Sequence, residues 1–115
     1  MSVRARFRFR IYNDTAVAIG PGKVDLLEAI AQTGSISAAA RSMNMSYRRA
    51  WSLVEILNQS LNEPAVITAT GGVQGGGASL TGVGEEIVTR YRAIEAAATA
   101  AADADITELT RLLRE

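Results

Sequence analysis

Residues 70–84, TGGVQGGGASLTGVG, are the first segment whose residue types and spacing could do chemistry. They hold seven of the chain's ten glycines, and Gly72, Gly77 and Ser79 have the spacing of a phosphate-binding P-loop. The lysine of that motif is missing, and the chain's only lysine is the distant Lys23. Without this charge the outer phosphates of a nucleotide have no partner. The segment therefore disfavours nucleotide hydrolysis and favours a flexible hairpin tip.

A second segment, residues 46–52, combines hydroxyl and guanidinium groups at the start of an expected helix. Arg48 or Arg49 could bind guanine through two hydrogen bonds, and the sequence does not decide between them. Ser35 and Ser37 precede the helix before it, where they could offer N–H groups to a phosphate or act as plain caps. The residues of this region that we expect to contact DNA are Ser35, Ser37, Ser46, Tyr47, Arg48, Arg49 and Ser52.

The composition argues against an enzyme. The 115 residues include no cysteine and no histidine, which excludes thiol catalysis, disulfides, Ser-His-Asp triads and the usual zinc sites. The neighbouring carboxylates Glu85 and Glu86 diverge by about 100° on a helix, too far for a paired catalytic site. We therefore expect no catalytic residue, no metal and no cofactor.

Charge is distributed unevenly along a chain whose net charge is zero. Residues 1–50 hold eight Arg or Lys against three Asp or Glu, and residues 51–115 hold four against nine, so the halves carry +5 and −5. A basic half suits a polyanionic partner, although chance clustering on a solvated surface gives the same count. No apolar run approaches the roughly 20 residues needed to span a bilayer, so we expect a cytoplasmic protein without membrane contact.

The elements that would position these groups begin with a strand. Residues 3–12 alternate strictly between apolar and polar side chains, which predicts a half-buried strand whose arginine face either protects a sheet edge or contacts nucleic acid. Residues 13–22 are expected to form a loop. A helix follows over residues 23–34, ending at Gly34 in a left-handed conformation.

Residues 37–62 predict two helices joined by a tight turn. Ser37 would cap the first, Asn44 suits a left-handed turn position, and Ser46 would cap the second, which Pro64 confines to the region before residue 63. Trp51 is expected in the core. Small or apolar side chains occupy the positions where a helix-turn-helix needs a close crossing, namely Ala39, Ala40, Met43, Met45, Ala50 and Leu53.

The second half predicts a hairpin and two further helices. Residues 66–80 read as two short strands around the glycine-rich tip, a wing. Thr81 would cap a long helix over residues 82–102, and Asp105 a short one over residues 105–114. Apolar residues recur in these helices with a period of 3.5, which favours a homodimer over packing within one domain. The expected dimer residues are Ile87, Tyr91, Ile94, Ala98, Ala101, Ile106, Leu109 and Leu113.

This order of elements predicts a mainly α fold with a small β wing. Residues 1–115 would form a single winged helix-turn-helix domain with an N-terminal strand and a long C-terminal dimerisation helix. In such folds the second helix of the motif enters the major groove with its N-terminal residues toward base edges. The expected function is sequence-specific binding to double-stranded DNA by a homodimer. The alternative is a winged-helix protein-interaction module without DNA binding.

Residues 34–58 and 70–91 together also resemble the N-terminal domain of ModE-type molybdate-responsive transcriptional regulators, which is similar to the LysR-type winged helix. The shared motifs are Gly34-Ser35-Ile36-Ser37, Ser46-Tyr47, Ala50-Trp51, Thr70-Gly71-Gly72, Gly75-Gly76-Gly77-Ala78 and Leu80-Thr81 with Gly84.

The resemblance implies a homodimeric repressor or activator whose wing lies beside the DNA backbone. The wing residues expected at DNA are Thr70, Gly71, Gly72, Gln74, Gly75 and Gly76. Full-length members of that group carry C-terminal molbindin domains that bind molybdate, for which the sequence up to Glu115 has no room. We therefore do not expect this chain to sense molybdate.

Overall fold

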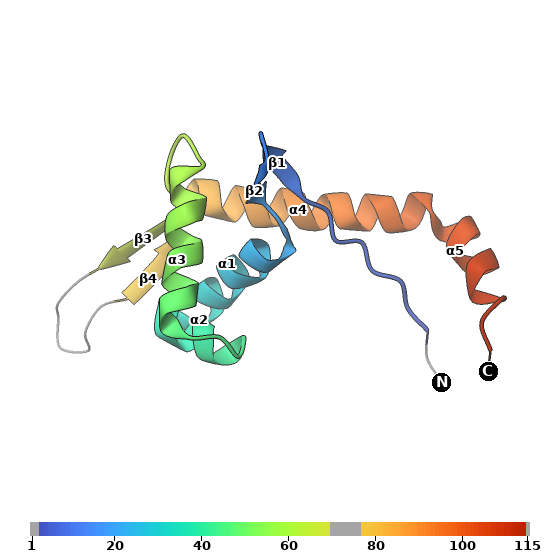
Figure 1. Ribbon diagram of the computed structural model, residues 1–115, viewed down its shortest axis with the longest axis horizontal. Coiled ribbons are helices and arrows are strands. Elements are labelled where there is room, and N and C mark those ends of the chain that lie inside the picture. Colours follow the sequence, from blue (N-terminus) through green and yellow to red (C-terminus); the bar gives the residue numbers. More distant parts are fainter. Residues whose placement is uncertain (1–2, 70–76, 115) are drawn as a thin grey trace.

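The computed structural model describes residues 3–69 and 77–114. Three helices and the wing hairpin form a compact part, here called the head, and a long helix extends away from it (Figure 1). The molecule measures 56 × 33 × 23 Å along its principal axes. Its elements are β1 (Ile11–Asn13), β2 (Ala16–Ile19), α1 (Pro21–Thr33), α2 (Ile36–Ser42), α3 (Tyr47–Gln59), β3 (Val66–Ala69), β4 (Gly77–Leu80), α4 (Gly82–Ala101) and α5 (Asp103–Thr110).

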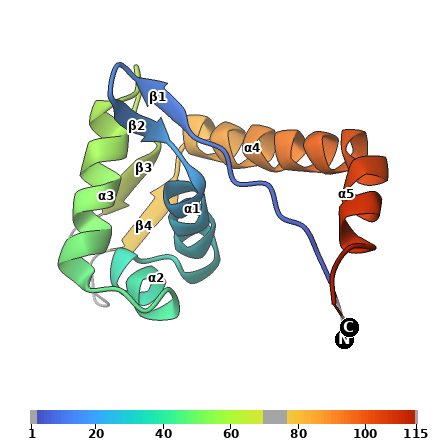
Figure 2. The same ribbon diagram turned by 45° about the vertical axis from the view of Figure 1, so that its right-hand side comes forward.

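The N-terminal region differs from the prediction. A strand over residues 3–12 and a loop over 13–22 were expected, but β1 begins at Ile11 and pairs with β2 inside the supposed loop. Asp14 takes a φ of 56° in the turn between them, so that Ile11 lies opposite Ile19. Residues 3–10 belong to no sheet, because the only strand facing β1 in the described chain is this short one. They run beside α4 instead (Figure 2).

The contacts of Phe9 explain why the alternating pattern of residues 3–12 wrongly predicted a strand. Its ring stacks on that of Tyr91 in α4, with centroids 4.1 Å apart. The Tyr91 hydroxyl accepts a hydrogen bond from the Phe9 N–H at 3.1 Å and donates one to the Phe9 carbonyl at 2.8 Å. A side chain thus satisfies backbone groups that a neighbouring strand would otherwise pair.

Helix ends follow local signals in most places. Gly34 ends α1 with a φ of 79°, as predicted. α2 is capped by Ser35 rather than Ser37, since the Ser35 hydroxyl accepts the N–H of Ala38 at 3.0 Å. α5 starts directly after Ala102 and has no side-chain cap, so Asp105 lies within it. The predicted span of 105–114 is therefore shifted in the structure to residues 103–110.

The turn between α2 and α3 is the predicted one. Asn44 has a φ of 60°, and the Met45 N–H donates to the Ala40 carbonyl at 3.0 Å. Ser46 caps α3, with its hydroxyl accepting the Arg49 N–H at 3.0 Å. The small side chains that permit the close crossing are buried, namely Ala39, Ala40 and Ala50, with Met43, Met45 and Leu53 packed against them.

The wing is attached to the head by polar contacts. β3 and β4 pair antiparallel, with Val66 opposite Leu80. The Asn58 side chain accepts the Ala65 N–H at 2.8 Å and donates to the Val66 carbonyl at 3.1 Å, which holds the strand on α3. To bring Ala65 and Val66 back against Asn58, the chain must turn directly after the helix, which explains why α3 ends at Gln59 and not near residue 62. On the other side, the Ala78 N–H donates to the Gly34 carbonyl at 2.9 Å.

The start of α4 presses against the chain just before β3. Thr81 caps the helix by accepting the Gly84 N–H at 3.1 Å, as predicted, and its hydroxyl donates to the Pro64 carbonyl at 2.7 Å. Gly84 is buried so closely against the Ala65 carbonyl that a Cβ would overlap the oxygen. Only glycine fits there without moving backbone.

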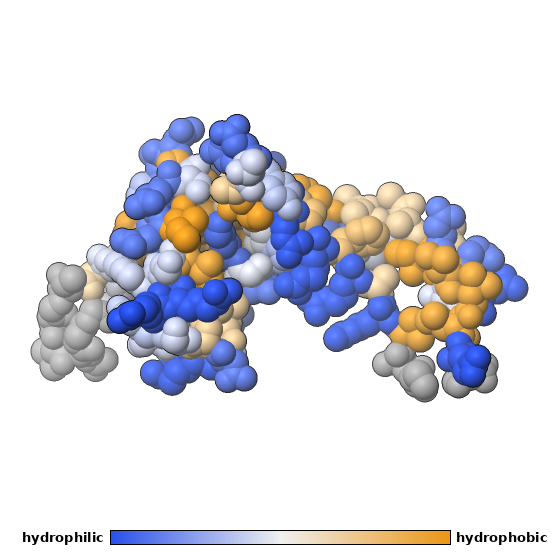
Figure 3. All heavy atoms as spheres, in the orientation of Figure 1, coloured by the Kyte–Doolittle hydropathy of each residue, from blue (hydrophilic) through white to orange (hydrophobic). Residues whose placement is uncertain are grey.

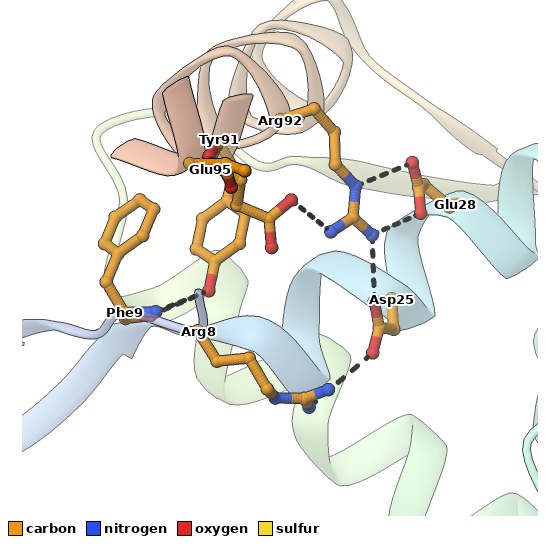
Figure 4. Close-up of polar contacts among 8 residues, drawn as sticks. Arg8, Phe9, Asp25, Glu28, Tyr91, Arg92 and Glu95 are labelled. Carbon is orange, nitrogen blue, oxygen red and sulfur yellow. Dashed lines mark hydrogen bonds and ion pairs between the residues drawn. The ribbon is translucent and has the colours of Figure 1, made fainter. Parts of the chain in front are cut away.

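One arginine links α4 to α1 (Figure 4). Arg92 donates to Asp25 at 2.8 Å and to Glu28 from α1, and to Glu95 of its own helix at 2.9 Å. Arg8 lies 3.9 Å from the other oxygen of Asp25 and ties the N-terminal segment to the same cluster. The hydrogen bond to Glu28 raises the pKa of Arg92, so its charge persists throughout the accessible pH range.

Gly84→Ala should lower the free energy of unfolding by about 1–3 kcal/mol, because the added methyl group overlaps a backbone oxygen that cannot move freely. Gly82→Ala is the matched control in the same turn. A Cβ there meets nothing within 4 Å, so stability should change by no more than about 0.5 kcal/mol. Urea unfolding followed by circular dichroism measures both, and equal effects would contradict the close approach.

Arg92→Met should destabilise the protein by about 1 kcal/mol, because three carboxylates lose a shared partner that is about a third exposed. Added salt should recover part of this loss by screening their repulsion. Arg90→Met breaks only the exposed pair with Glu86 and should cost less than about 0.5 kcal/mol. Equal unfolding midpoints for the two variants at low salt would contradict a structural role for the cluster.

Candidate nucleic-acid interface

The first turns of α3 project from the head. Ala50, Val54 and Leu57 form its buried stripe. At about 100° per residue, Arg48 and Ser52 lie on roughly the opposite side. Figure 1 shows this end of α3 beside α2, at the far end of the helix from α4. The side chains predicted to reach DNA from α3 are all exposed, namely Ser46, Tyr47, Arg48, Arg49 and Ser52.

Four of the chain's eleven arginines form ion pairs among the described residues, and the unpaired ones include Arg4, Arg6 and Arg10 of the N-terminal segment as well as three in the helix-turn-helix. Arg8, Arg90, Arg92 and Arg111 form ion pairs with carboxylates. Within residues 3–69 and 77–114, no carboxylate pairs with Arg48 or Arg49, or with the exposed Arg41 in the last turn of α2. These three side chains therefore keep their charge available for an external anion.

Arg41 was missed in the sequence analysis. It stands three residues before the turn position Asn44, and the Asn44 N–H donates to its carbonyl at 3.2 Å. A count of charges within the helix-turn-helix alone would have found it, because that segment holds only three basic residues before Glu55.

Acidic side chains lie away from this end. Glu55 is exposed on the third turn of α3, so the outward face of the helix changes sign along its length. Glu85 and Glu86 sit in the first turns of α4, which passes the C-terminal end of α3 (Figures 1 and 2). The positive part of α3 is thus limited to its N-terminal half.

A groove separates the start of α3 from the wing. It has a volume of about 260 Å³, and we call it the aromatic groove because Tyr47 and Trp51 form its α3 side. It is lined by Ser35, Ile36 and Ser37 of α2, Tyr47 and Trp51 of α3, and Thr68, Ala69, Gly77 and Ala78 of the wing.

Trp51 was predicted to be a core residue, and this was wrong. Its side chain is 37% exposed. Trp51 follows Ala50 by one residue and therefore lies at the rim of the stripe formed by Ala50, Val54 and Leu57 rather than within it. Around the helix Trp51 is about 60° from Val54 and about 120° from Leu57, so it lies off the buried stripe and lines the aromatic groove beside α2 and the wing.

The remaining predicted DNA contacts are only partly described. Ser35 uses its hydroxyl as the cap of α2, and Ser37 lies half-buried in the first turn of that helix. The wing-tip residues lie outside the described residues, namely Thr70, Gly71, Gly72, Gln74, Gly75 and Gly76.

The predicted dimer residues divide into two groups. Tyr91 is 2% exposed and Ile87 packs against the core, so both are used within the chain itself. Ile94, Leu109 and Leu113 are exposed, and apolar atoms gather over the end of α4 and over α5 (Figure 3). Among the remaining residues of the predicted dimer surface, Ala101 is exposed, whereas Ala98 and Ile106 are half-buried.

None of the helices in the described part of the chain is both long and apolar enough to cross a membrane.

Comparison with known proteins agrees with this geometry. Residues 22–85 match the family described as bacterial regulatory helix-turn-helix protein, lysR family. Molybdenum-pterin-binding protein MopB of Rhodobacter capsulatus is 50% identical over 82 residues, covering 71% of this chain and 30% of that protein. Molybdenum transport protein ModE of Azotobacter vinelandii is 41% identical over 88 residues, covering 76% and 33%.

A third relative is the DNA-binding transcriptional dual regulator ModE of Escherichia coli K12. It is 41% identical over 71 residues, covering 62% of this chain and 27% of that protein. The chain thus spans about a third of the length of the curated relatives it matches. The resemblance to ModE-type regulators found in the sequence is confirmed over this region.

Solved structures show the same fold. The DNA-binding domain of CbnR, solved in complex with DNA, has a TM-score of 0.57 at 19% identity, covering 76% of this chain and 95% of that one. Full-length CbnR with its target DNA has a TM-score of 0.53 at 20% identity, covering 76% and 28%. The predicted winged helix-turn-helix fold is confirmed. The chain belongs to the lysR family of bacterial regulatory helix-turn-helix proteins.

Proposed function

We propose that this chain is a DNA-binding transcriptional regulator that inserts the first turns of α3 into the major groove. The observation that carries the proposal is the pair of exposed arginines, Arg48 and Arg49, without carboxylate partners among the described residues, at the projecting end of a helix-turn-helix. Membership of the family supports it, and so do the regulators among its relatives. No part of this function requires catalysis.

Arg48 is the better candidate for base recognition. It lies on roughly the opposite side of α3 from Ala50 and Val54, whereas Arg49 is rotated by about 100° away from the wing. An outward guanidinium can reach the acceptors O6 and N7 of guanine, and one at the flank meets the phosphate backbone first. We assign Arg49 and Arg41 to phosphates.

The wing and α2 would add contacts to the backbone. Ser35 and Ser37 stand at the start of α2, next to the aromatic groove. Glycines at the wing tip allow the chain to approach the sugar-phosphate backbone closely. A regulator of this kind acts on the bacterial chromosome, so we place it in the cytoplasm.

A homodimer formed through α4 and α5 would present two copies of α3 to the DNA. Ile94 is 48% exposed at the edge of an apolar groove of about 290 Å³ between the β1–β2 hairpin and α4. Leu109, Leu112 and Leu113 are exposed in and after α5. Covering these side chains with a second copy removes apolar surface from water, and two-fold symmetry matches a palindromic operator.

The alternative is an interaction module that has lost DNA binding. That function requires acidic side chains near the exposed end of α3, where they would repel phosphates. Glu85 and Glu86 instead lie on α4 past the other end of α3. The placement of charge therefore favours DNA binding.

Removing Arg48 tests the proposed function directly. A duplex selected by the protein from a randomised pool should bind Arg48→Ala about 10- to 100-fold more weakly, as expected for one lost guanine contact. Arg49→Ala should weaken binding to all sequences and lower the slope of log affinity against log salt by about 1. Fluorescence anisotropy at several salt concentrations measures both quantities.

Arg6→Ala is the control for these variants. It removes the same charge from an exposed side chain of the N-terminal segment beside α4, outside both the aromatic groove and the apolar groove assigned to the dimer. It should bind the selected duplex like the wild type. Salt-independent binding, or equal losses in all three variants, would contradict a specific role for α3.

Ile94→Glu should shift the protein from dimer to monomer, because it places a charge in the apolar groove that we assign to the interface. Ala96→Glu makes the same change on α4 roughly 200° further around the helix and should remain dimeric. Sedimentation equilibrium distinguishes the two. A monomeric wild type, or a dimeric Ile94→Glu, would argue against this interface.

A further inference from the structure

We propose that Tyr47 and Trp51 form an apolar reading surface for the C5-methyl group of a thymine in the major groove. This inference rests on the proposed function and extends it, because it assigns a base preference to the aromatic groove. The two residues are four apart in α3 and therefore neighbours on one face of the helix.

Their exposure needs an explanation. Tyr47 is 57% and Trp51 is 37% exposed, although both rings are large and apolar in part. Exposed apolar side chains that cluster at one place commonly mark a binding surface. Here the cluster continues into the groove, whose lining includes the buried side chains of Ile36 and Ala78. The wild-type fold thus keeps an apolar surface open at the end of α3 that we propose to enter DNA.

Charge excludes a phosphate as the main occupant of this groove. Neither lysine nor arginine is among the described residues that line it, and residues 66–80, which form the whole wing, contain none. A phosphate placed in this groove against the aromatic rings, without a cation, would lose hydration without compensation. The remaining polar groups of the lining are hydroxyls of Ser35, Ser37, Tyr47 and Thr68, which carry no charge, and that of Ser35 already caps α2.

A thymine methyl fits the remaining requirement. It is the one apolar group that a base pair presents in the major groove. Arg48 lies beside the aromatic pair on α3, about 100° around the helix from Tyr47 and about 60° from Trp51. If Arg48 reads a guanine, the rings face a neighbouring base pair on the wing side, so the two contacts together would specify a guanine with an adjacent thymine.

Replacing thymine by deoxyuridine tests this contact, because uracil lacks the methyl group and pairs with adenine in the same way. In the duplex selected from the randomised pool, each thymine is replaced in turn and the dissociation constant is measured. At one or two positions in each half-site the wild type should lose roughly fourfold in affinity, the amount expected for one buried methyl group. Elsewhere the replacement should have little effect.

Variants of α3 show whether the rings cause this loss. Trp51→Ala should bind the thymine duplex more weakly and show almost no further loss with uracil at the sensitive position. Tyr47→Phe retains its ring and should keep the sensitivity. Ile56→Ala removes an exposed apolar side chain of the same helix that does not line the groove, and it should behave like the wild type. Thermal unfolding confirms that each variant is folded.

Three results would overturn the proposal. The first is that the selected duplex binds in a salt-dependent way but loses no affinity when uracil replaces thymine at any position. A second is full uracil sensitivity in Trp51→Ala together with a uniform loss on all sequences, which would assign the rings to the sugar-phosphate backbone. Failure of the pool to yield any bound duplex would overturn the regulator function and this inference together.

Discussion

The structure depends on the close crossing of α2 and α3. Ala39, Ala40 and Ala50 are almost completely buried where the helices meet, and a larger side chain at any of them would push the helices apart. Asn44 reverses the chain in a left-handed conformation that costs most residues more than it costs asparagine. Together these constraints direct the start of α3 outward from the head.

The protein keeps structural charges apart from available ones. Arg92 is surrounded by three carboxylates and fixes α4 against α1. Arg48 and Arg49 have no such partners in the described residues and stand at the exposed end of α3. The same residue type therefore serves two purposes. A stable frame holds the orientation of α3, and the free guanidinium groups meet the anionic partner proposed for it.

Local signals made much of this fold predictable. Gly34 and Asn44 act through their own backbone geometry, and Ser46 and Thr81 act through an N–H three residues away, so their roles follow from short stretches of sequence. The order of elements then predicted the winged helix-turn-helix.

What the sequence did not reveal depends on distant partners. Phe9 and Tyr91 are 82 residues apart, and their contact replaced the expected strand and removed Tyr91 from the proposed dimer surface. The exposure of Trp51 likewise depends on where the wing strands lie against α3.

Insertion of α3 into the major groove is tested most directly by the protection of guanine N7 from dimethyl sulfate on a bound duplex. Insertion of α3 predicts a protected guanine in the major groove of each half-site that becomes reactive in Arg48→Ala; guanines equally reactive with and without the protein would contradict it.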